Sequence, residues 1–186
     1  NDKQGVKNLK NKIEELKEVS LYYLIDKVDK FTNKLSGISI SVEAGNAYYL
    51  GFNDVLDEDE FLEEFKSVFE DFEIKKYSHD LKNFIVYLKQ KGIELNGISF
   101  DTMIGAYIIN PSRETYTISE LASDFLNLDI KPIEEMSGKG RSFVSFAGMD
   151  EKDLKNLVVL YPQVIFMSMQ KIADKLKEND QANLYY

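Results

Sequence analysis

Residues 19–25 are VSLYYLI, a continuous apolar run rich in residues that favour β-structure. Such a run is typical of a strand that is buried on both faces of a sheet. Two further strands are predicted at 37–42 and 47–52, joined by a turn at residues 44–46, AGN. The first part of the chain therefore predicts a hairpin packed beside a doubly buried strand.

Helices and short strands alternate along the rest of the chain. Acidic residues crowd the start of a predicted helix that opens at Asp54, where the helix dipole favours them. Ser78 or Asp80 is predicted to cap the third helix and Asp101 the fourth. The order of elements predicts an α/β fold, a mixed sheet flanked by helices. The predicted elements are a helix or linker at 1–17, strands at 74–77 and 98–100, and helices at 54–69, 81–91, 101–108, 117–126 and 150–179.

The composition excludes several classes of protein. The chain has 186 residues and no cysteine, so disulfides and thiolate metal sites are ruled out. Its net charge is −9, which argues against a free-standing nucleic-acid binder, because Lys and Arg supply most of the affinity for phosphate. The N-terminus does not resemble a signal peptide, and no run of about 20 apolar residues occurs. We therefore expect a cytoplasmic protein without a membrane span.

Three stretches of the second half carry a family resemblance. Residues 92–103 are GIELNGISFDTM, residues 106–111 are AYIINP, and residues 134–140 are EEMSGKG. In order and spacing they resemble the 3′–5′ exonuclease-like domain of bacterial family-A DNA polymerases, the DNA polymerase I family. The resemblance implies an RNase H-like (DnaQ-like exonuclease) fold, a mixed five-stranded sheet flanked by helices. It also implies that residues 18–186 form this domain and that a polymerase domain follows it.

Active members of this family cut the 3′ terminal phosphodiester bond with two metal ions, held by carboxylate oxygens. The family supplies the carboxylates in three motifs: Asp-x-Glu on the first strand, Asn-x-x-x-Asp on a helix and Tyr-x-x-x-Asp on the last helix. The resemblance places the first motif on Tyr22 and Leu24, within one or two residues, so that Asp26 is a neighbouring candidate. It places the Asp of the second motif on Phe84, and the Tyr and Asp of the third on Leu157 and Tyr161.

The residues at these positions predict a degenerate site without catalytic residues. Phenyl and isobutyl groups offer a metal no lone pair, and a lone Asp26 cannot replace four carboxylates. We therefore expect no metal or other cofactor in this domain, with Mg²⁺ needed only in the polymerase domain of the parent protein. Tyr22, Leu24, Phe84 and Tyr161 are predicted to cluster and to fill the former metal site.

The resemblance implies an inactive domain that serves as a structural module of a replication and repair polymerase. Its expected partners are the polymerase domain of the same chain and, through the parent protein, DNA; we expect a monomer. Two alternatives stay open: a metal-dependent 3′–5′ exonuclease with a rebuilt site, and an acidic protein-interaction module. Lys139 and Arg141 belong either to a plain loop or to a contact with DNA or a neighbouring domain. His79, the single histidine, is interpreted as a surface residue beside a helix cap.

Overall fold

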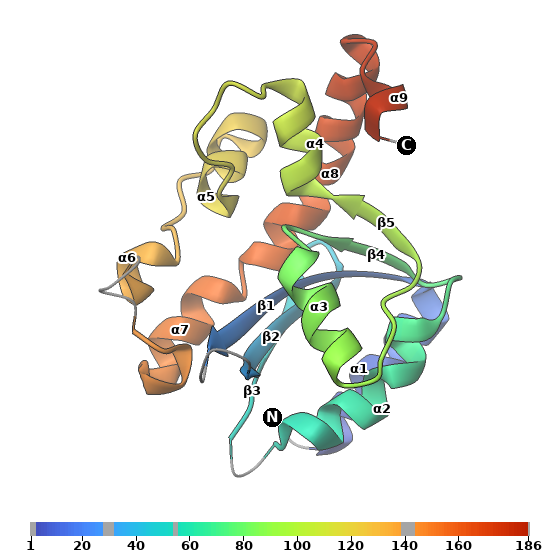
Figure 1. The fold of residues 1–186 in the computed structure, drawn as a ribbon, viewed down its shortest axis with the longest axis vertical. Coiled ribbons are helices and arrows are strands. Elements are labelled where there is room, and N and C mark those ends of the chain that lie inside the picture. Colours follow the sequence, from blue (N-terminus) through green and yellow to red (C-terminus); the bar gives the residue numbers. More distant parts are fainter. Residues whose placement is uncertain (1–2, 28–31, 54–55, 139–143, 186) are drawn as a thin grey trace.

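A computed structural model describes residues 3–27, 32–53, 56–138 and 144–185 (Figure 1). Its centre is a five-stranded sheet with the strand order β3-β2-β1-β4-β5. β1 pairs antiparallel with β2 and parallel with β4; β2 and β3 are antiparallel, and β4 and β5 are parallel. The predicted mixed five-stranded sheet is confirmed. The strands are β1 Glu18–Lys27, β2 Asn33–Glu43, β3 Asn46–Gly51, β4 Lys75–Ser78 and β5 Ile98–Asp101.

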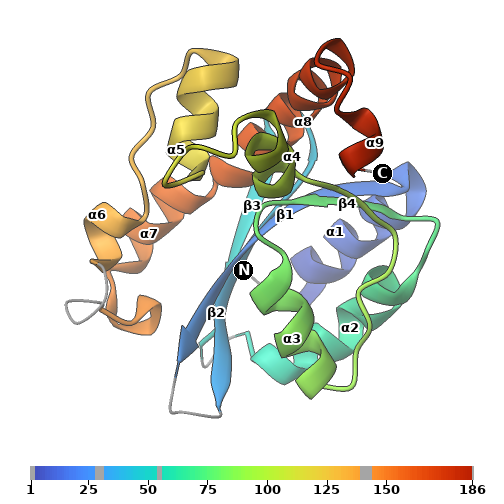
Figure 2. The same ribbon diagram turned by 45° about the horizontal axis from the view of Figure 1, so that its top comes forward.

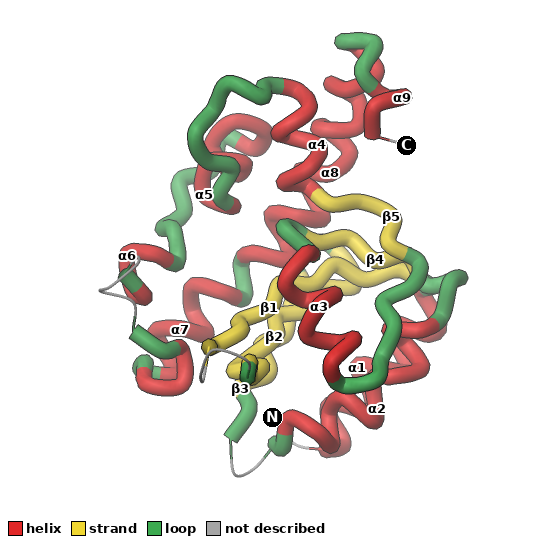
Figure 3. The backbone as a smooth tube through the Cα atoms, in the orientation of Figure 1, coloured by secondary structure: helices red, strands yellow, loops and turns green. Residues whose placement is uncertain are grey.

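Helices cover both faces of this sheet, as Figure 3 shows. α1, α2 and α3 share one core cluster with the sheet, whereas α8 crosses the other face with α4, α5 and α7 packed around it. The longer helices are α1 Lys3–Leu16, α2 Glu58–Glu70, α3 Lys82–Gln90, α4 Thr102–Ile109, α7 Glu151–Val158 and α8 Tyr161–Glu178. The short ones are α5 Ile118–Leu121, the π-helix Ala122–Leu126, α6 Glu134–Ser137, the 3₁₀-helix Phe146–Gly148 and α9 Ala182–Tyr185.

The central strand β1 feeds both cores, because successive side chains of a strand point to opposite faces. Val19 and Leu21 belong to the core under α1, α2 and α3. Leu24 belongs to the core under α8, and Tyr22 packs against it. This alternation explains why residues 19–25 are apolar apart from Ser20, whose buried hydroxyl donates to the carbonyl of Pro162 (2.7 Å).

The predicted cap of α3 is wrong. The Ser78 hydroxyl donates to the carbonyl of Leu21 (2.8 Å), and Asp80 has a positive φ of 53°. The carboxylate of Asp101 instead accepts from the backbone N–H groups of Asp80 (3.1 Å) and Leu81 (2.9 Å). Asp101 also caps α4, as predicted, so a single carboxylate holds the starts of two helices.

Two helix boundaries also differ from the prediction. The single helix expected at 150–179 is two helices, α7 and α8, with a break at residues 159–160. Pro162 lies in the first turn of α8, where its missing N–H costs no helical hydrogen bond. α2 begins at Glu58 rather than at Asp54, because Asp57 is its N-cap and accepts from the N–H groups of the first turn; residues 54–55 lie outside the described residues.

Within the described ranges, no helix combines the length and the apolar character that crossing a bilayer requires.

Candidate functional site

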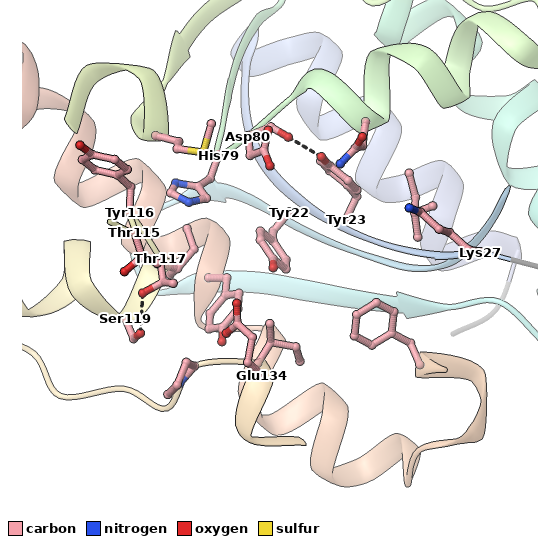
Figure 4. Close-up of a pocket in the computed structure, with 18 of the residues that line it drawn as sticks. Tyr22, Tyr23, Lys27, His79, Asp80, Thr115, Tyr116, Thr117, Ser119 and Glu134 are labelled. Carbon is pink, nitrogen blue, oxygen red and sulfur yellow. Dashed lines mark hydrogen bonds between the residues drawn. The ribbon is translucent and has the colours of Figure 1, made fainter. Parts of the chain in front are cut away.

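A groove of about 490 Å³ opens beside the C-terminal half of β1. Its walls come from β1, the start of α3, the segment 114–119 that leads into α5, the segment 132–134 and the first residue of α8 (Figure 4). It is lined by two of the positions assigned to the motifs, Tyr22 and Tyr161, and by Tyr23, the neighbour of Tyr22. The groove is thus where the resemblance places the first and third motifs.

Tyr22 and Tyr161 meet in the wall of this groove. Their ring centroids lie 4.8 Å apart and the ring planes are at 84°, an edge-to-face arrangement. The Tyr161 hydroxyl donates to the backbone carbonyl of Lys131 (2.9 Å). Burial is the main cause that raises the pKa of both hydroxyls above the ordinary value of a tyrosine, and the nearby Glu134 carboxylate raises it further. Both phenols are therefore neutral at pH 7, which makes their oxygens weak ligands for a divalent cation.

The other predicted positions divide between the two cores. Leu24 lies with Tyr161 in the core under α8, and the half-buried Leu157 packs against that core. Phe84 is fully buried in the opposite core, so the predicted cluster of four is wrong for this residue. The cause is the placement of α3, which packs on the face that Tyr23 points to, and there Phe84 stacks on Tyr23 with centroids 4.8 Å apart. Tyr23 in turn lies beside Tyr22, at 6.2 Å.

Asp26, the neighbouring candidate for the first motif, is occupied by hydrogen bonds. Its buried carboxylate accepts from the hydroxyls of Ser36 (2.6 Å) and Ser145 (2.8 Å). It also accepts from the backbone N–H groups of Phe146 (2.9 Å) and Ala147 (3.1 Å). With both oxygens engaged, Asp26 ties the segment 145–147 to the end of β1.

The remaining acids of the groove do not form a ligand set. Asp80, Glu114 and Glu134 line it from three separate segments. Burial, with a smaller contribution from Asp101, raises the pKa of Asp80, and the Asp80 carbonyl accepts a hydrogen bond from the Tyr23 hydroxyl (Figure 4). Across the described residues, no three His, Cys, Asp or Glu side chains gather as a metal ion requires. The residues at the assigned positions therefore do not fit a divalent cation.

His79 is buried, and its interpretation as a surface residue is wrong. Its Nδ1 lies 2.9 Å from Oγ1 of Thr102, and the Thr102 hydroxyl donates to the carbonyl of Ser78 (3.1 Å). Burial lowers the pKa of His79 to about 4, against an opposing effect of the Asp101 carboxylate. The imidazole is neutral at pH 7 and joins β4, α4 and the backbone of Tyr116, an arrangement that residues 78–80 alone could not indicate.

The polar wall of the groove also includes Lys27, Asn33 and Asn83, which sequence patterns did not single out. Each is a common surface residue type, and only the fold brings them to one groove. Lys139 and Arg141, the predicted contact residues, lie outside the described residues.

The similarity of this chain to known proteins identifies its family. The profile described as "DNA polymerase I, ribonuclease H-like domain" matches residues 21–148. The chain belongs to this family. The DNA polymerase I of Bacillus subtilis is 34% identical over 149 residues, which are 80% of this chain and 16% of that protein. The chain thus spans about a sixth of the length of this DNA polymerase I.

Solved structures agree on the fold. RNase D of Escherichia coli, an exoribonuclease involved in structured RNA processing, matches with a TM-score of 0.74 at 12% identity, over 96% of this chain and 44% of that chain. The POL domain of Pol1 from M. smegmatis, in complex with DNA primer-template and dNTP, matches with a TM-score of 0.69 at 17% identity, over 95% of this chain and 28% of that chain. The RNase H-like exonuclease fold of the DNA polymerase I domain is therefore confirmed.

Proposed function

We propose that this chain is a non-catalytic 3′–5′ exonuclease-like domain of a bacterial DNA polymerase I, where it serves as a structural module. The observation that carries the proposal is the edge-to-face pair of Tyr22 and Tyr161. These two side chains occupy positions that the family resemblance assigns to metal-binding carboxylates. A packed aromatic pair stabilises the sheet against α8, whereas clustered carboxylates without a metal would repel one another.

The chemistry of the surrounding residues supports the loss of catalysis. Two divalent ions about 4 Å apart need several carboxylates to offset their charge. The side chains of Leu24 and Phe84 are buried and contain no oxygen atom that could bind a metal. The nearest acid on β1, Asp26, already accepts four hydrogen bonds. The described groove thus offers acids that are too scattered to form a ligand set. Its other oxygens include those of neutral phenols, which are poor ligands for Mg²⁺.

The proposed partner is the polymerase domain of the same protein. The curated relatives named DNA polymerase I are several times longer than this chain, which supports a parent protein with further domains. In this proposal the parent works in the bacterial cytoplasm as a monomer and binds DNA, while the domain itself, with its charge of −9, binds DNA weakly or not at all. Mg²⁺ serves the polymerase domain of the parent.

The test is a nuclease assay on the 186-residue chain. A series of 5′-labelled single-stranded oligonucleotides is incubated with Mg²⁺ or Mn²⁺, and 3′ shortening is followed on a gel. We expect none above a buffer control. Shortening that Asp80→Asn and Glu134→Gln abolish would reject the proposal, because it would demonstrate a rebuilt site in the groove.

A further inference from the structure

A second groove, of about 450 Å³, lies at the edge of the sheet, and we call it the β3 groove. The four consecutive β3 residues 47–50 line it, together with residues of α1 and α7. Successive side chains of a strand point to opposite faces, so a groove lined by four consecutive residues runs along the edge of the strand. In Figure 2, α7 lies to one side of β2 and β3 and α1 to the other.

The outer edge of β3 is open for pairing. β3 is the end strand of the sheet, and its neighbour is β2. In the part of the chain that the structure describes, residues 47–50 make no backbone–backbone hydrogen bond outside this strand pairing. The two faces of β3 are filled, since Leu50 belongs to the core under α1 and Tyr49 to the core under α8. An open edge of this kind is a template for a further strand.

The charge of the β3 groove is opposite to that of the whole chain. Its lining includes Lys12 of α1 and Lys155 of α7, and none of the described lining residues is acidic. Lys12 is paired with Glu43 at one end of the groove (2.5 Å). Lys155 is exposed and takes part in none of the ion pairs found among the described residues. On a chain of charge −9, this groove therefore favours an acidic occupant.

We propose that the β3 groove binds an extended acidic and apolar peptide segment of another protein, which adds to β3 as a sixth strand. This inference goes beyond the proposed function and does not depend on it. In such a complex the backbone hydrogen bonds supply affinity, and the alternate side chains of the peptide supply specificity. Four strand residues span about 13 Å, so the bound core of the peptide is short.

Both walls of the groove fit such a peptide. Alternate side chains of an added strand would contact α1 on one face of the sheet and α7 on the other. The α1 wall offers the aliphatic side chains of Val6 and Leu9, and the α7 wall offers Val159 beside Lys155. Tyr48, which is 40% exposed, lies on the strand between them. Apolar side chains of the peptide would pack on these groups, and a carboxylate would pair with Lys155.

A second copy of this chain fits the groove less well than a separate peptide does. Pairing of two β3 edges would bring the lysines of one groove towards those of the other, and like charges repel. The two chains, with a charge of −9 each, would also repel one another as whole molecules.

The experiment selects peptides from a displayed library of random heptapeptides on the immobilised 186-residue chain at low salt. Enriched peptides are synthesised with a fluorophore, and their affinity is measured by anisotropy. We expect sequences in which acidic and apolar residues alternate. Two variants test the site at exposed positions, where folding is not at risk: Lys155→Glu reverses its charge, and Asn8→Trp fills it from α1. Each should weaken binding at least tenfold.

Lys89→Glu is the matched control, because it changes the net charge equally at an exposed position of α3, outside the groove. It should leave the affinity within about twofold of the wild-type value. Methylation of the peptide nitrogens tests strand addition itself. The N–H groups of alternate residues of an added strand face β3, so methylation of one alternate set should abolish binding and methylation of the other should preserve it.

Several outcomes would overturn the proposal. The β3 groove is not a peptide site if no peptide is enriched, or if Asn8→Trp leaves the binding of the enriched peptides unchanged. Enrichment of basic peptides would contradict the charge argument. Equal effects of the two methylated sets would exclude strand addition. A dimer in sedimentation that Asn8→Trp dissociates would identify a second copy as the occupant. Nuclease activity of the chain would reject the proposed function and leave these results unaffected.

Discussion

Tyr22 on β1 and Tyr161 at the start of α8 meet edge to face, with ring centroids 4.8 Å apart. The pair joins the central strand to the helix that crosses the sheet, over a sequence separation that no local pattern spans. Both rings belong to or pack against the core under α8, and Tyr161 is also tied to the carbonyl of Lys131. The contact therefore fixes the start of α8 and one wall of the groove.

Removing either ring should destabilise the domain strongly. Tyr161→Ala removes a buried aromatic side chain, for which losses of about 3–5 kcal/mol are typical, and Tyr22→Ala should cost somewhat less because Tyr22 is only half-buried. The double variant should lose less than the sum of the two single losses, by about 0.5–1.5 kcal/mol, because the ring contact is lost only once. Urea unfolding of the four proteins measures this coupling. Strictly additive losses would mean that the two rings contribute only as separate hydrophobic groups.

Gly97 and Gly92 test how the GIEL segment shapes the chain. Both have a positive φ, of 67° and 72°. A Cβ at Gly97 would lie 2.4 Å from the carbonyl oxygen of Ile74, whereas none of the surrounding atoms lies within 4 Å of a Cβ at Gly92. Gly92→Ala should cost about 1 kcal/mol, from its backbone conformation alone.

Gly97→Ala should cost about 3 kcal/mol or more, because the backbone of Ile74 must shift as well. The Gly97 carbonyl accepts from the N–H of Lys76, so the shift would also disturb β4. Thermal or urea unfolding of both variants provides the comparison. Equal losses would show that the neighbouring backbone yields easily.

The strands and the family could be predicted from the sequence for local reasons. The apolar run at 19–25 is continuous because β1 feeds two cores, and the alternation at 37–42 marks a neighbouring strand. The spacing of the GIEL and EEMSGKG stretches carried the family, and the matched profile agrees. Local pattern and spacing thus suffice where neighbouring residues determine the outcome.

Three of the errors concern contacts between distant residues. Counting from Gly92 fixed the position of Phe84 but not its direction, which follows from the packing of α3 on Phe69 of α2 and on Tyr23. The capping of α3 links Asp101 to Leu81 and Asp80, which lie 20 and 21 positions earlier in the sequence. The burial of His79 depends on Thr102 and Tyr116. Each of these outcomes requires the tertiary fold.

Two serines of β2 should respond in opposite directions to the same substitution. Both are almost fully buried. The Ser41 hydroxyl bonds to the carbonyls of Glu43 (2.9 Å) and Asn46 (3.0 Å), whereas Ser39 Oγ finds no hydrogen-bond partner among the described residues. Ser39→Ala removes an unpaired buried hydroxyl and should raise the free energy of unfolding by about 1 kcal/mol. Ser41→Ala should lower it by a similar amount. A loss in both variants, measured by urea unfolding, would mean that Ser39 is paired in solution.

The buried imidazole of His79 makes stability depend on pH in a defined direction. Burial lowers its pKa from 6.5 to about 4 in the folded chain. At a pH between these values the unfolded chain binds a proton that the folded chain does not bind. The contribution of His79 to the free energy of unfolding is therefore fully present above about pH 6.5 and falls as the pH is lowered towards 4. Below about pH 4 this group causes no further change.

His79→Gln should flatten this part of the stability curve, because glutamine does not titrate and its amide can still bond to the Thr102 hydroxyl. The pH-dependent loss in free energy of unfolding assigned to His79 amounts to as much as about 3 kcal/mol.

Urea unfolding of the wild-type and His79→Gln proteins at several pH values from 7.5 to 4 gives the two stability curves. The two proteins have the same carboxylates, and His79 is the single histidine of the sequence. The difference between the curves therefore isolates the effect of the imidazole. We expect that difference to change with pH between about 6.5 and 4 and to be constant above 7. Parallel curves throughout would mean that His79 takes up protons equally well in the folded and unfolded chains. Its enclosure by β4, α4 and the backbone of Tyr116 would then not lower its pKa.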